Sequence, residues 1–156
     1  MTILGIDPGT TRIGFGVIET RGGELAHIKS GLLPVPPASG NAHLMHIARA
    51  LSELIKEVSP EKAGVERLFF SKNKKTALAV AEARGVIMHT LLAAQIPVLE
   101  LTPNEVKVAT TGDGSATKTA VAKMVSAILR TPLTHLVDDA TDALAIAIAS
   151  ANTRIQ

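Results

Sequence analysis

The sequence contains no cysteine, tryptophan or tyrosine, and only 3 phenylalanines. The absence of cysteine excludes disulfides and thiolate zinc sites, so any metal must be bound through oxygen or imidazole ligands. It also fits a cytoplasmic location. Because aromatic residues make up 2% of the chain, the core must consist of Ala, Val, Leu and Ile, and surfaces on which a ligand can stack are scarce.

Long apolar runs are absent as well. No stretch approaches the roughly 18 residues that span a bilayer, and the N-terminus MTILGIDPG lacks the basic region and cleavage site of a signal peptide. We therefore expect neither secretion nor membrane insertion. The 16 basic and 14 acidic residues leave a net charge of +2, which does not by itself indicate a polyanionic partner. The length predicts a single domain, residues 1–156.

The first part of the chain has the pattern of a strand meander. Three runs of apolar and small residues are separated by turns at Asp7-Pro8-Gly9 and Arg21-Gly22-Gly23. The expected strands cover residues 2–6, 13–19 and 24–33. A proline-rich connection at 34–40 follows, which can be neither helix nor central strand.

The rest of the chain alternates helices with short strands. An amphipathic helix with Asn41 as N-cap is expected to run to about Val58. An Ala-rich helix is expected over 76–95, and Gly85 inside it can permit close approach of another helix, for instance in a dimer. The other expected elements are strands at 62–66 and 97–101, a short helix opened by Thr102-Pro103, a helix capped by Ser115 that ends near Arg130, and a helix over 138–152.

This order of elements predicts an α/β fold. Its mixed sheet would join an antiparallel three-strand meander to two parallel strands, with helices flanking the sheet. The last segment alternates Ala with larger residues and can pass for a strand by its period alone. Its length, its Ala content and the Asp pair at its start favour a buried helix.

Four acidic residues stand where this fold can bring side chains together. Asp7 ends the first expected strand and Glu66 the fourth, and open α/β sheets place their ligand sites at strand ends. Asp139 and Asp142 lie three residues apart, which puts both carboxylates on one face of the last helix. The four carboxylates can therefore converge.

Crowded carboxylates raise one another's pKa unless cations compensate their charge. An all-oxygen ligand set with room for water and phosphate fits Mg²⁺ or Mn²⁺. Two such ions about 4 Å apart would activate a water and stabilise the leaving oxygen in phosphodiester hydrolysis. Each residue also has an ordinary explanation, since Asp-Pro-Gly is a common turn, Glu66 can be a surface charge and Asp138 or Asp139 can cap a helix. The metal hypothesis depends on the combination.

Four stretches of the chain carry a further signal. They are Gly5-Ile6-Asp7-Pro8-Gly9, Val65-Glu66 followed by Phe69 and Lys72-Asn73, Ala83-Arg84-Gly85-Val86, and Asp139-Ala140-Thr141-Asp142-Ala143-Leu144-Ala145. In this order and at these spacings they resemble the RuvC-type Holliday-junction resolvases, over nearly the whole chain. The resemblance implies a ribonuclease H-like fold and a homodimer that needs Mg²⁺ or Mn²⁺ and cuts two strands of like polarity in a four-way DNA junction. It also implies the branch-migration proteins RuvA and RuvB as partners.

The same resemblance assigns roles to the acidic residues. By motif position, Asp7, Glu66, Asp139 and Asp142 look like the family's metal-binding catalytic carboxylates, which implies two ions in each active site. The third acidic position is the least fixed, because some members carry His there. His135 lies four residues upstream of that position and is interpreted as part of a loop.

The densest basic stretch of the chain also holds Phe69 and Phe70. An exposed Phe can stack on an unpaired base for about 1–3 kcal/mol while Lys contacts phosphate. By resemblance Phe69 is the family's base-wedging aromatic, whereas Phe70 is assigned to packing. The candidate DNA contacts around them are Arg67, Lys72, Asn73, Lys74 and Lys75, of which the last two fit either phosphate contacts or a solvated face. Two further candidates, Lys107 and Lys118, match lysines near the family's active site, although helix lysines are usually solvated.

Three other functions fit parts of the sequence. Asp7-Pro8-Gly9-Thr10-Thr11 also resembles the phosphate-binding hairpin of sugar kinases and actin-like ATPases, but those proteins need a second lobe. A junction-binding module without catalysis is disfavoured because all four carboxylates are present. An RNA-processing nuclease of the same superfold would share the acidic cluster, and the Phe69 segment is the feature that separates it from a junction enzyme.

Overall fold

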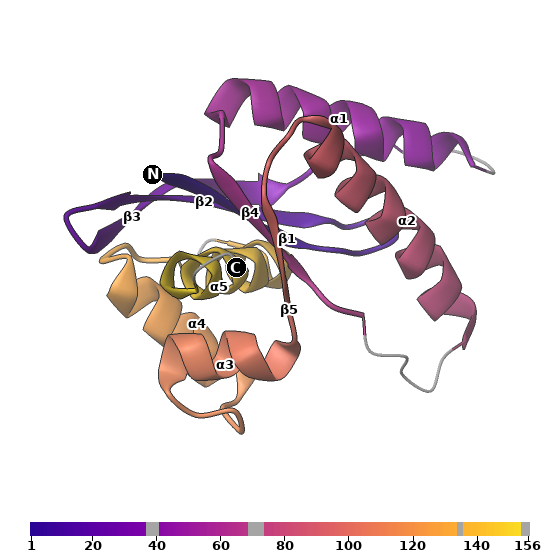
Figure 1. The fold of residues 1–156 in the computed structure, drawn as a ribbon. Coiled ribbons are helices and arrows are strands. Elements are labelled where there is room, and N and C mark those ends of the chain that lie inside the picture. Colours follow the sequence, from indigo (N-terminus) through magenta and orange to yellow (C-terminus); the bar gives the residue numbers. More distant parts are fainter. Residues whose placement is uncertain (37–40, 69–73, 134–135, 154–156) are drawn as a thin grey trace.

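The computed structural model describes residues 1–36, 41–68, 74–133 and 136–153. In these ranges five strands form one sheet in the order β3-β2-β1-β4-β5 (Figure 1). The antiparallel meander comprises β1 (Thr2–Asp7), β2 (Gly14–Arg21) and β3 (Glu24–Leu32). On the other side of β1 the sheet continues in parallel through β4 (Lys62–Glu66) and β5 (Val98–Leu101). The expected mixed α/β sheet is confirmed.

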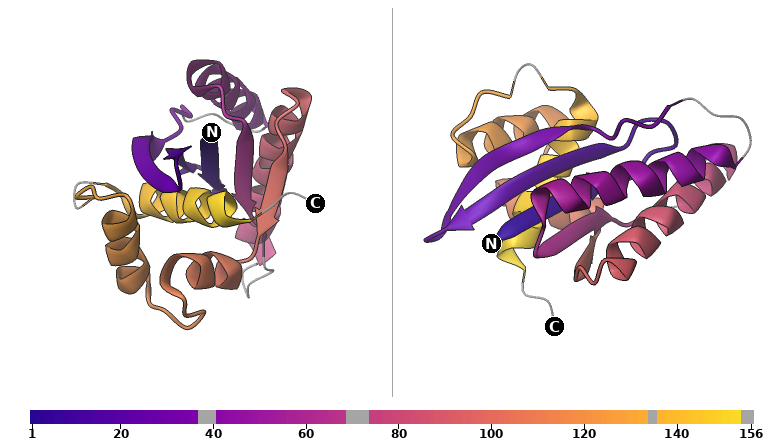
Figure 2. Two further views of the ribbon diagram at one scale, coloured as in Figure 1. Left: turned by 60° about the vertical axis from the view of Figure 1, so that its left-hand side comes forward. Right: turned by 90° about the horizontal axis from the view of Figure 1, so that it is seen from above.

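Helices cover both faces of this sheet (Figures 1 and 2). One face carries α1 (Ala42–Val58) and α2 (Lys74–Ala93), which pack on each other. The other face carries α5 (Asp138–Asn152), with α3 (Pro103–Thr111) and α4 (Lys118–Ile128) packed against α5. An apolar core lies on each side of the sheet, built mostly of Ala, Val, Leu and Ile as the composition predicts. No helix in the described ranges has the length and apolarity needed to cross a membrane.

Two helices, α2 and α4, differ at their ends from the sequence predictions. α2 begins at Lys74, so Lys74 and Lys75 belong to the first turn of a helix rather than to the preceding polar connection. The N-cap of α4 is Thr117, not Ser115. The Asp113 carboxylate accepts hydrogen bonds from the backbone N–H of Ser115 at 2.8 Å and from its hydroxyl at 2.7 Å. This local turn occupies Ser115 and delays the start of the helix.

Two other expectations about the helices are confirmed. Thr102 caps α3 in a reciprocal capping box with Glu105, and Pro103 follows at the first helical position. The segment over 138–152 is a helix, and most of its side chains are buried. Asn41 occupies the N-cap position of α1, although its side chain makes no capping hydrogen bond.

Successive side chains of a strand point to opposite faces of the sheet, so every second residue faces α5. On β1, Leu4 and Ile6 join the core under α1 and α2, so Gly5 and Asp7 face the opposite way, toward α5. On β4 the same period places Glu66 on the α5 face, because Gly64, two residues earlier, contacts that helix. The ends of the two parallel neighbours β1 and β4 therefore present their carboxylates on the face that α5 covers.

Glycines let the backbone of α5 rest directly on the sheet. A Cβ atom on Gly5 would lie 2.0 Å from the carbonyl oxygen of Ala143, and one on Gly14 would lie 2.0 Å from that of Asp139. Because these contacts are with backbone, no side-chain rotation can relieve them. The first turns of α5, which carry Asp139 and Asp142, are held close to the end of β1.

We expect the Gly5→Ala substitution to lower the free energy of unfolding by about 1–3 kcal/mol, because the added methyl group overpacks the contact with α5. The matched control is Gly85→Ala. Within the described ranges nothing lies within 4 Å of a Cβ at Gly85, so the close helix approach expected there is not made within this part of the chain. At this exposed position of the helix the control should raise stability by up to about 1 kcal/mol. Urea denaturation measures both values, and equal effects of the two substitutions would contradict the packing argument.

Candidate active site

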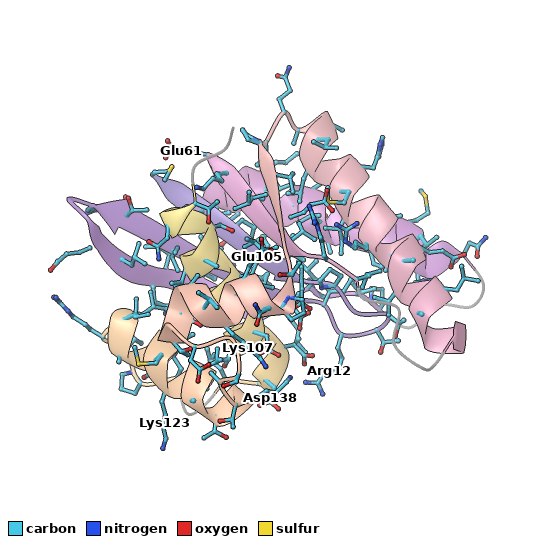
Figure 3. The ribbon with its side chains drawn as sticks, turned by 60° about the horizontal axis from the view of Figure 1, so that its bottom comes forward. Arg12, Glu61, Glu105, Lys107, Lys123 and Asp138 are labelled. Carbon is cyan, nitrogen blue, oxygen red and sulfur yellow. The ribbon has the colours of Figure 1, made fainter. Side chains whose placement is uncertain are left out.

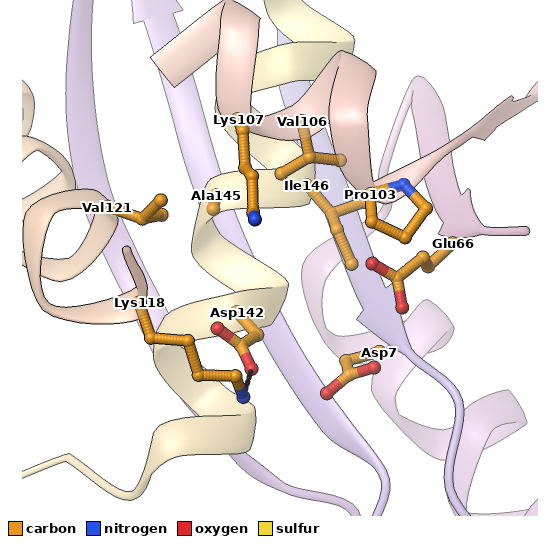
Figure 4. A pocket seen from close by; sticks show the side chains of 10 residues that line it. All are labelled: Asp7, Glu66, Pro103, Val106, Lys107, Lys118, Val121, Asp142, Ala145 and Ile146. Carbon is orange, nitrogen blue, oxygen red and sulfur yellow. Dashed lines mark hydrogen bonds and ion pairs between the residues drawn. The ribbon is translucent and has the colours of Figure 1, made fainter. Parts of the chain in front are cut away.

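A cavity of about 230 Å³ lies where β1 and β4 end, and residues of α3, α4 and α5 line its other sides (Figure 4). Three of the four predicted carboxylates, those of Asp7, Glu66 and Asp142, point into it. The remaining lining residues are two lysines and a set of small or apolar side chains, namely Lys107, Lys118, Pro103, Val106, Val121, Ala145 and Ile146. The structure thus brings carboxylates from two strands and one helix together in a single recess.

Burial and mutual repulsion raise the pKa values of the two strand carboxylates. The pKa of Asp7 rises from 3.8 to about 7, chiefly through burial, then through the negative charges of Glu66, Asp142 and Asp139, while Lys118 opposes the rise. The pKa of Glu66 also rises, through burial first and then through Asp142. Two half-buried acids with raised pKa values in one recess mark a site that favours binding of a cation.

Two lysines bring positive charge to the recess. The Nζ atom of Lys118 lies 2.9 Å from Oδ2 of Asp142, and this hydrogen bond is the main reason why the pKa of Lys118 is raised. Lys107 extends from α3 into the space above the carboxylates (Figure 4). Both lysines expected from the resemblance therefore lie at the acidic cavity.

Asp139 stands apart from the other three carboxylates. It does not line the cavity, although its charge contributes to the raised pKa of Asp7. Its Oδ2 atom accepts hydrogen bonds from Nε of Arg12 at 2.9 Å and from Nη2 at 2.5 Å. Figure 3 shows Arg12 and Asp138 on the edge of the molecule where α5 begins. Nothing in the sequence pattern singled out Arg12, because its partner lies 127 positions away.

Arg84 is another residue whose role the sequence did not indicate. Its Nε atom donates a hydrogen bond to the backbone carbonyl of Glu66 at 3.0 Å, and its guanidinium also pairs with Glu100 of β5. Arg84 is largely buried, so these bonds fix the end of β4 from the side of α2. The motif Ala83-Arg84-Gly85-Val86 contributed to the family resemblance, and the structure gives its arginine a supporting place behind Glu66.

The predicted DNA contacts are placed only in part. Arg67 is exposed directly after Glu66. Hydrogen bonds with Thr102 lower the pKa of Glu105 on α3, and the charge of Arg67 adds a smaller effect in the same direction. Lys74 and Lys75 stand in the first turn of α2. Phe69, Lys72 and Asn73 lie outside the described residues, as does Phe70, so their assigned roles stay predictions.

The chemistry of the donor set fits a divalent metal ion. Asp7, Glu66 and Asp142 supply only carboxylate oxygens, the donors that Mg²⁺ and Mn²⁺ prefer, and the pKa values of the first two are raised by burial first and by neighbouring negative charge second. Within the described ranges no three His, Asp or Glu side chains already stand in an arrangement that could hold one ion. Lys118 instead pairs with Asp142, and Arg12 pairs with Asp139.

A sheet of order 3-2-1-4-5, with carboxylates at the ends of β1 and β4 and on the helix that crosses the same face, defines the ribonuclease H-like class of nucleases. The model of one family in this class, described as crossover junction endodeoxyribonuclease RuvC, matches residues 3–150. The chain belongs to the RuvC family.

Individual relatives agree with this assignment. The chain is 44% identical over 149 residues to the crossover junction endodeoxyribonuclease RuvC of Carboxydothermus hydrogenoformans, covering 96% of this chain and 94% of that protein. It resembles the solved structure of Thermus thermophilus RuvC in complex with a Holliday junction substrate with a TM-score of 0.87, at 32% identity over 97% of this chain and 93% of the other. The yeast mitochondrial Holliday junction resolvase Ydc2 shares the fold, with a TM-score of 0.71 at 13% identity over 94% of this chain and 76% of the other.

Proposed function

We propose that this chain is a structure-specific endodeoxyribonuclease that resolves four-way DNA junctions in recombination and repair. It nicks two strands of like polarity by metal-assisted hydrolysis of phosphodiesters. The observation that carries the proposal is the convergence of Asp7, Glu66 and Asp142 in one cavity of a RuvC-family chain. The Thermus thermophilus relative in complex with a Holliday junction substrate supports the choice of DNA.

The proposed catalytic and metal-binding residues are Asp7, Glu66, Asp139 and Asp142, with Mg²⁺ or Mn²⁺ as the cofactor and two ions in each active site. Bound divalent ions lower the pKa of an attacking water and neutralise charge on the leaving oxygen. The protein holds Asp7 and Glu66 at fixed strand ends, and α5 brings Asp142 to them across the glycines of the sheet. Lys107 and Lys118 place positive charge where a phosphate would enter, which favours the extra negative charge of the transition state.

The DNA-binding surface is proposed to continue from this cavity along the segment between β4 and α2. Phe69 would stack on an unpaired base at the crossover, and the flanking polar and basic residues would contact the backbone, namely Arg67, Lys72, Asn73, Lys74 and Lys75. The segment begins directly after Glu66, so a base held there would lie next to the cleavage site. This nearness supports a junction substrate over an RNA substrate.

A homodimer follows from the proposed reaction, because paired cuts in strands of like polarity need two active sites related by two-fold symmetry. Exposed apolar side chains on α1 and α2, Met45, Leu78 and Leu92, support that face as the contact between copies. Each copy would be one domain over residues 1–156. We further propose a cytoplasmic location and action with the branch-migration proteins RuvA and RuvB, as the family membership suggests.

The deciding experiment compares cleavage of a labelled synthetic four-way junction with cleavage of duplex DNA, single-stranded DNA and an RNA–DNA hybrid. Each substrate is tested with Mg²⁺, with Mn²⁺ and with a chelator. We expect paired nicks in opposing strands of the junction alone, abolished by the chelator. Cutting of RNA only would keep the fold and overturn the proposed substrate, and junction binding without cutting in either metal would indicate a recognition module.

A further inference from the structure

Arg12 ties the turn between β1 and β2 to the first turn of α5. Both Nε and Nη2 of Arg12 donate to the same oxygen, Oδ2 of Asp139, at 2.9 Å and 2.5 Å. The Asp139 side chain is 29% exposed and the Arg12 side chain 57% exposed. The guanidinium therefore covers the carboxylate from the solvent side and remains accessible to a ligand.

The pairing separates Asp139 from its neighbours in the proposed site. Asp142, three residues later on α5, is also paired, with Lys118, yet it lines the cavity together with its partner. Neither Asp139 nor Arg12 lines the cavity. Gly14 abuts the backbone carbonyl of Asp139, so the main chain cannot move closer to the sheet, and only rotation of the Asp139 side chain can bring its carboxylate to the cavity.

A phosphate of the DNA backbone is the ligand that competes best with Asp139 for the Arg12 guanidinium. Arg presents a fixed fork of donors that binds phosphate oxygens as well as carboxylate oxygens, and its charge persists at every physiological pH. An exposed ion pair contributes little free energy, so a phosphate can take the Arg12 side chain at small cost. Release of Arg12 leaves Asp139 with an uncompensated charge beside Asp7.

We propose that Arg12 is a positioning residue, which holds the Asp139 carboxylate outside the cavity in the DNA-free protein. When substrate binds, the Arg12 guanidinium releases Asp139 and pairs with a DNA phosphate instead. Asp139 then turns to complete the carboxylate set around the divalent ion. This inference rests on the proposed function and adds to it a coupling between DNA binding and metal binding. Because the exchange links two binding events, DNA must raise the affinity for the metal ion, and the ion must raise the affinity for DNA by the same factor.

The test uses the Arg12→Gln variant of the full chain and two binding measurements. Calorimetric titration of the DNA-free protein with Mn²⁺ should show about two- to fivefold tighter binding than wild type, because the competing ion pair is gone. In the presence of a chelator this variant should bind a four-way junction more weakly than wild type. The slope of the logarithm of its affinity against the logarithm of the salt concentration should be smaller in magnitude by about 1, the value for one lost phosphate contact. Loss of the Arg12 charge alone would shift both affinities in these directions. The exchange is therefore tested by the coupling, because a four-way junction should raise the Mn²⁺ affinity more in wild type than in Arg12→Gln.

The matched control is Arg21→Gln, which removes an arginine from an exposed ion pair with Glu19 at the other end of β2. It should leave the Mn²⁺ affinity unchanged, and Arg12→Lys should fall between wild type and Arg12→Gln. Unchanged or weaker Mn²⁺ binding by Arg12→Gln, while wild type binds Mn²⁺ and cuts junctions, would overturn this inference alone. A wild-type protein that neither binds Mn²⁺ nor cuts any junction would overturn the proposed function as well.

Discussion

Substitution of Asp7 by Asn is expected to lower the rate of junction cleavage by about 10²–10³-fold, because removal of one preorganised electrostatic group from an active site costs about that much. Burial raises the pKa of Asp7 most, and the negative charges of Glu66, Asp142 and Asp139 raise it further. Asn keeps the shape of the side chain but lacks the charge that holds a cation. We therefore expect the variant to be impaired in the cleavage step and in metal binding, and to fold like wild type.

Junction binding should survive this substitution or become tighter, because one negative charge facing the DNA backbone is removed. Single-turnover cleavage and a gel-shift titration measure the two effects separately. The matched control is Asp138→Asn, since Asp138 is an exposed acid in the first turn of α5 that does not line the cavity. Loss of binding together with cleavage would instead indicate a structural role for Asp7.

The metal-free protein is expected to lose stability as the pH rises from about 5 to 7.5. The pKa of Asp7 is 3.8 in its ordinary state and about 7 in the folded protein. Between these values the folded state binds more protons than the unfolded chain, so the free energy of unfolding falls as the pH rises and levels off once Asp7 is ionised. The pKa difference limits the loss to about 4 kcal/mol over the whole pH range, of which about 2.5 kcal/mol falls between pH 5 and 7.5. The raised pKa of Glu66 acts in the same direction.

Added Mg²⁺ should reverse the loss, and more strongly at pH 7.5 than at pH 5, because protons and metal ions compete for the same carboxylates. Thermal unfolding at several pH values, with Mg²⁺ and with chelator, measures this directly. The Asp7→Asn variant is the control, and both its pH dependence and its response to Mg²⁺ should be flatter. A melting temperature of the metal-free wild type that rises across this pH range would contradict the assignment of Asp7.

Strand periodicity and turn chemistry made much of this fold predictable. Asp7 could be placed at a strand end because Pro8 and Gly9 follow it, Glu66 because it closes a short apolar run, and the Asp pair could be placed on a helix by the length and Ala content of its segment. What the sequence did not disclose depends on contacts between distant residues. The pairing of Arg12 with Asp139 and the support of Glu66 by Arg84 arise only once the sheet and helices have packed.

Local competition explains the smaller errors. Ser115 has the chemistry of an N-cap, but the nearby Asp113 carboxylate takes both of its hydrogen-bond donors, and Thr117 caps α4 instead. Residue types alone cannot tell which of the two neighbours, Ser115 or Thr117, caps the helix, because the two arrangements differ little in free energy. Gly85 can permit close approach of another helix, and since the described part of this chain places nothing near it, a helix of a second copy in a dimer stays a prediction.

The contact of α5 with the glycines of the sheet limits how the active site can adapt to its ions. Backbone lies against backbone at Gly5 and Gly14, so no flexible side chain between helix and strand can absorb a shift of α5. The distance between the main chain that carries Asp7 and the main chain of α5 is consequently the same whichever ion enters. Accommodation of ions of different radius must come from rotation of the Asp and Glu side chains alone.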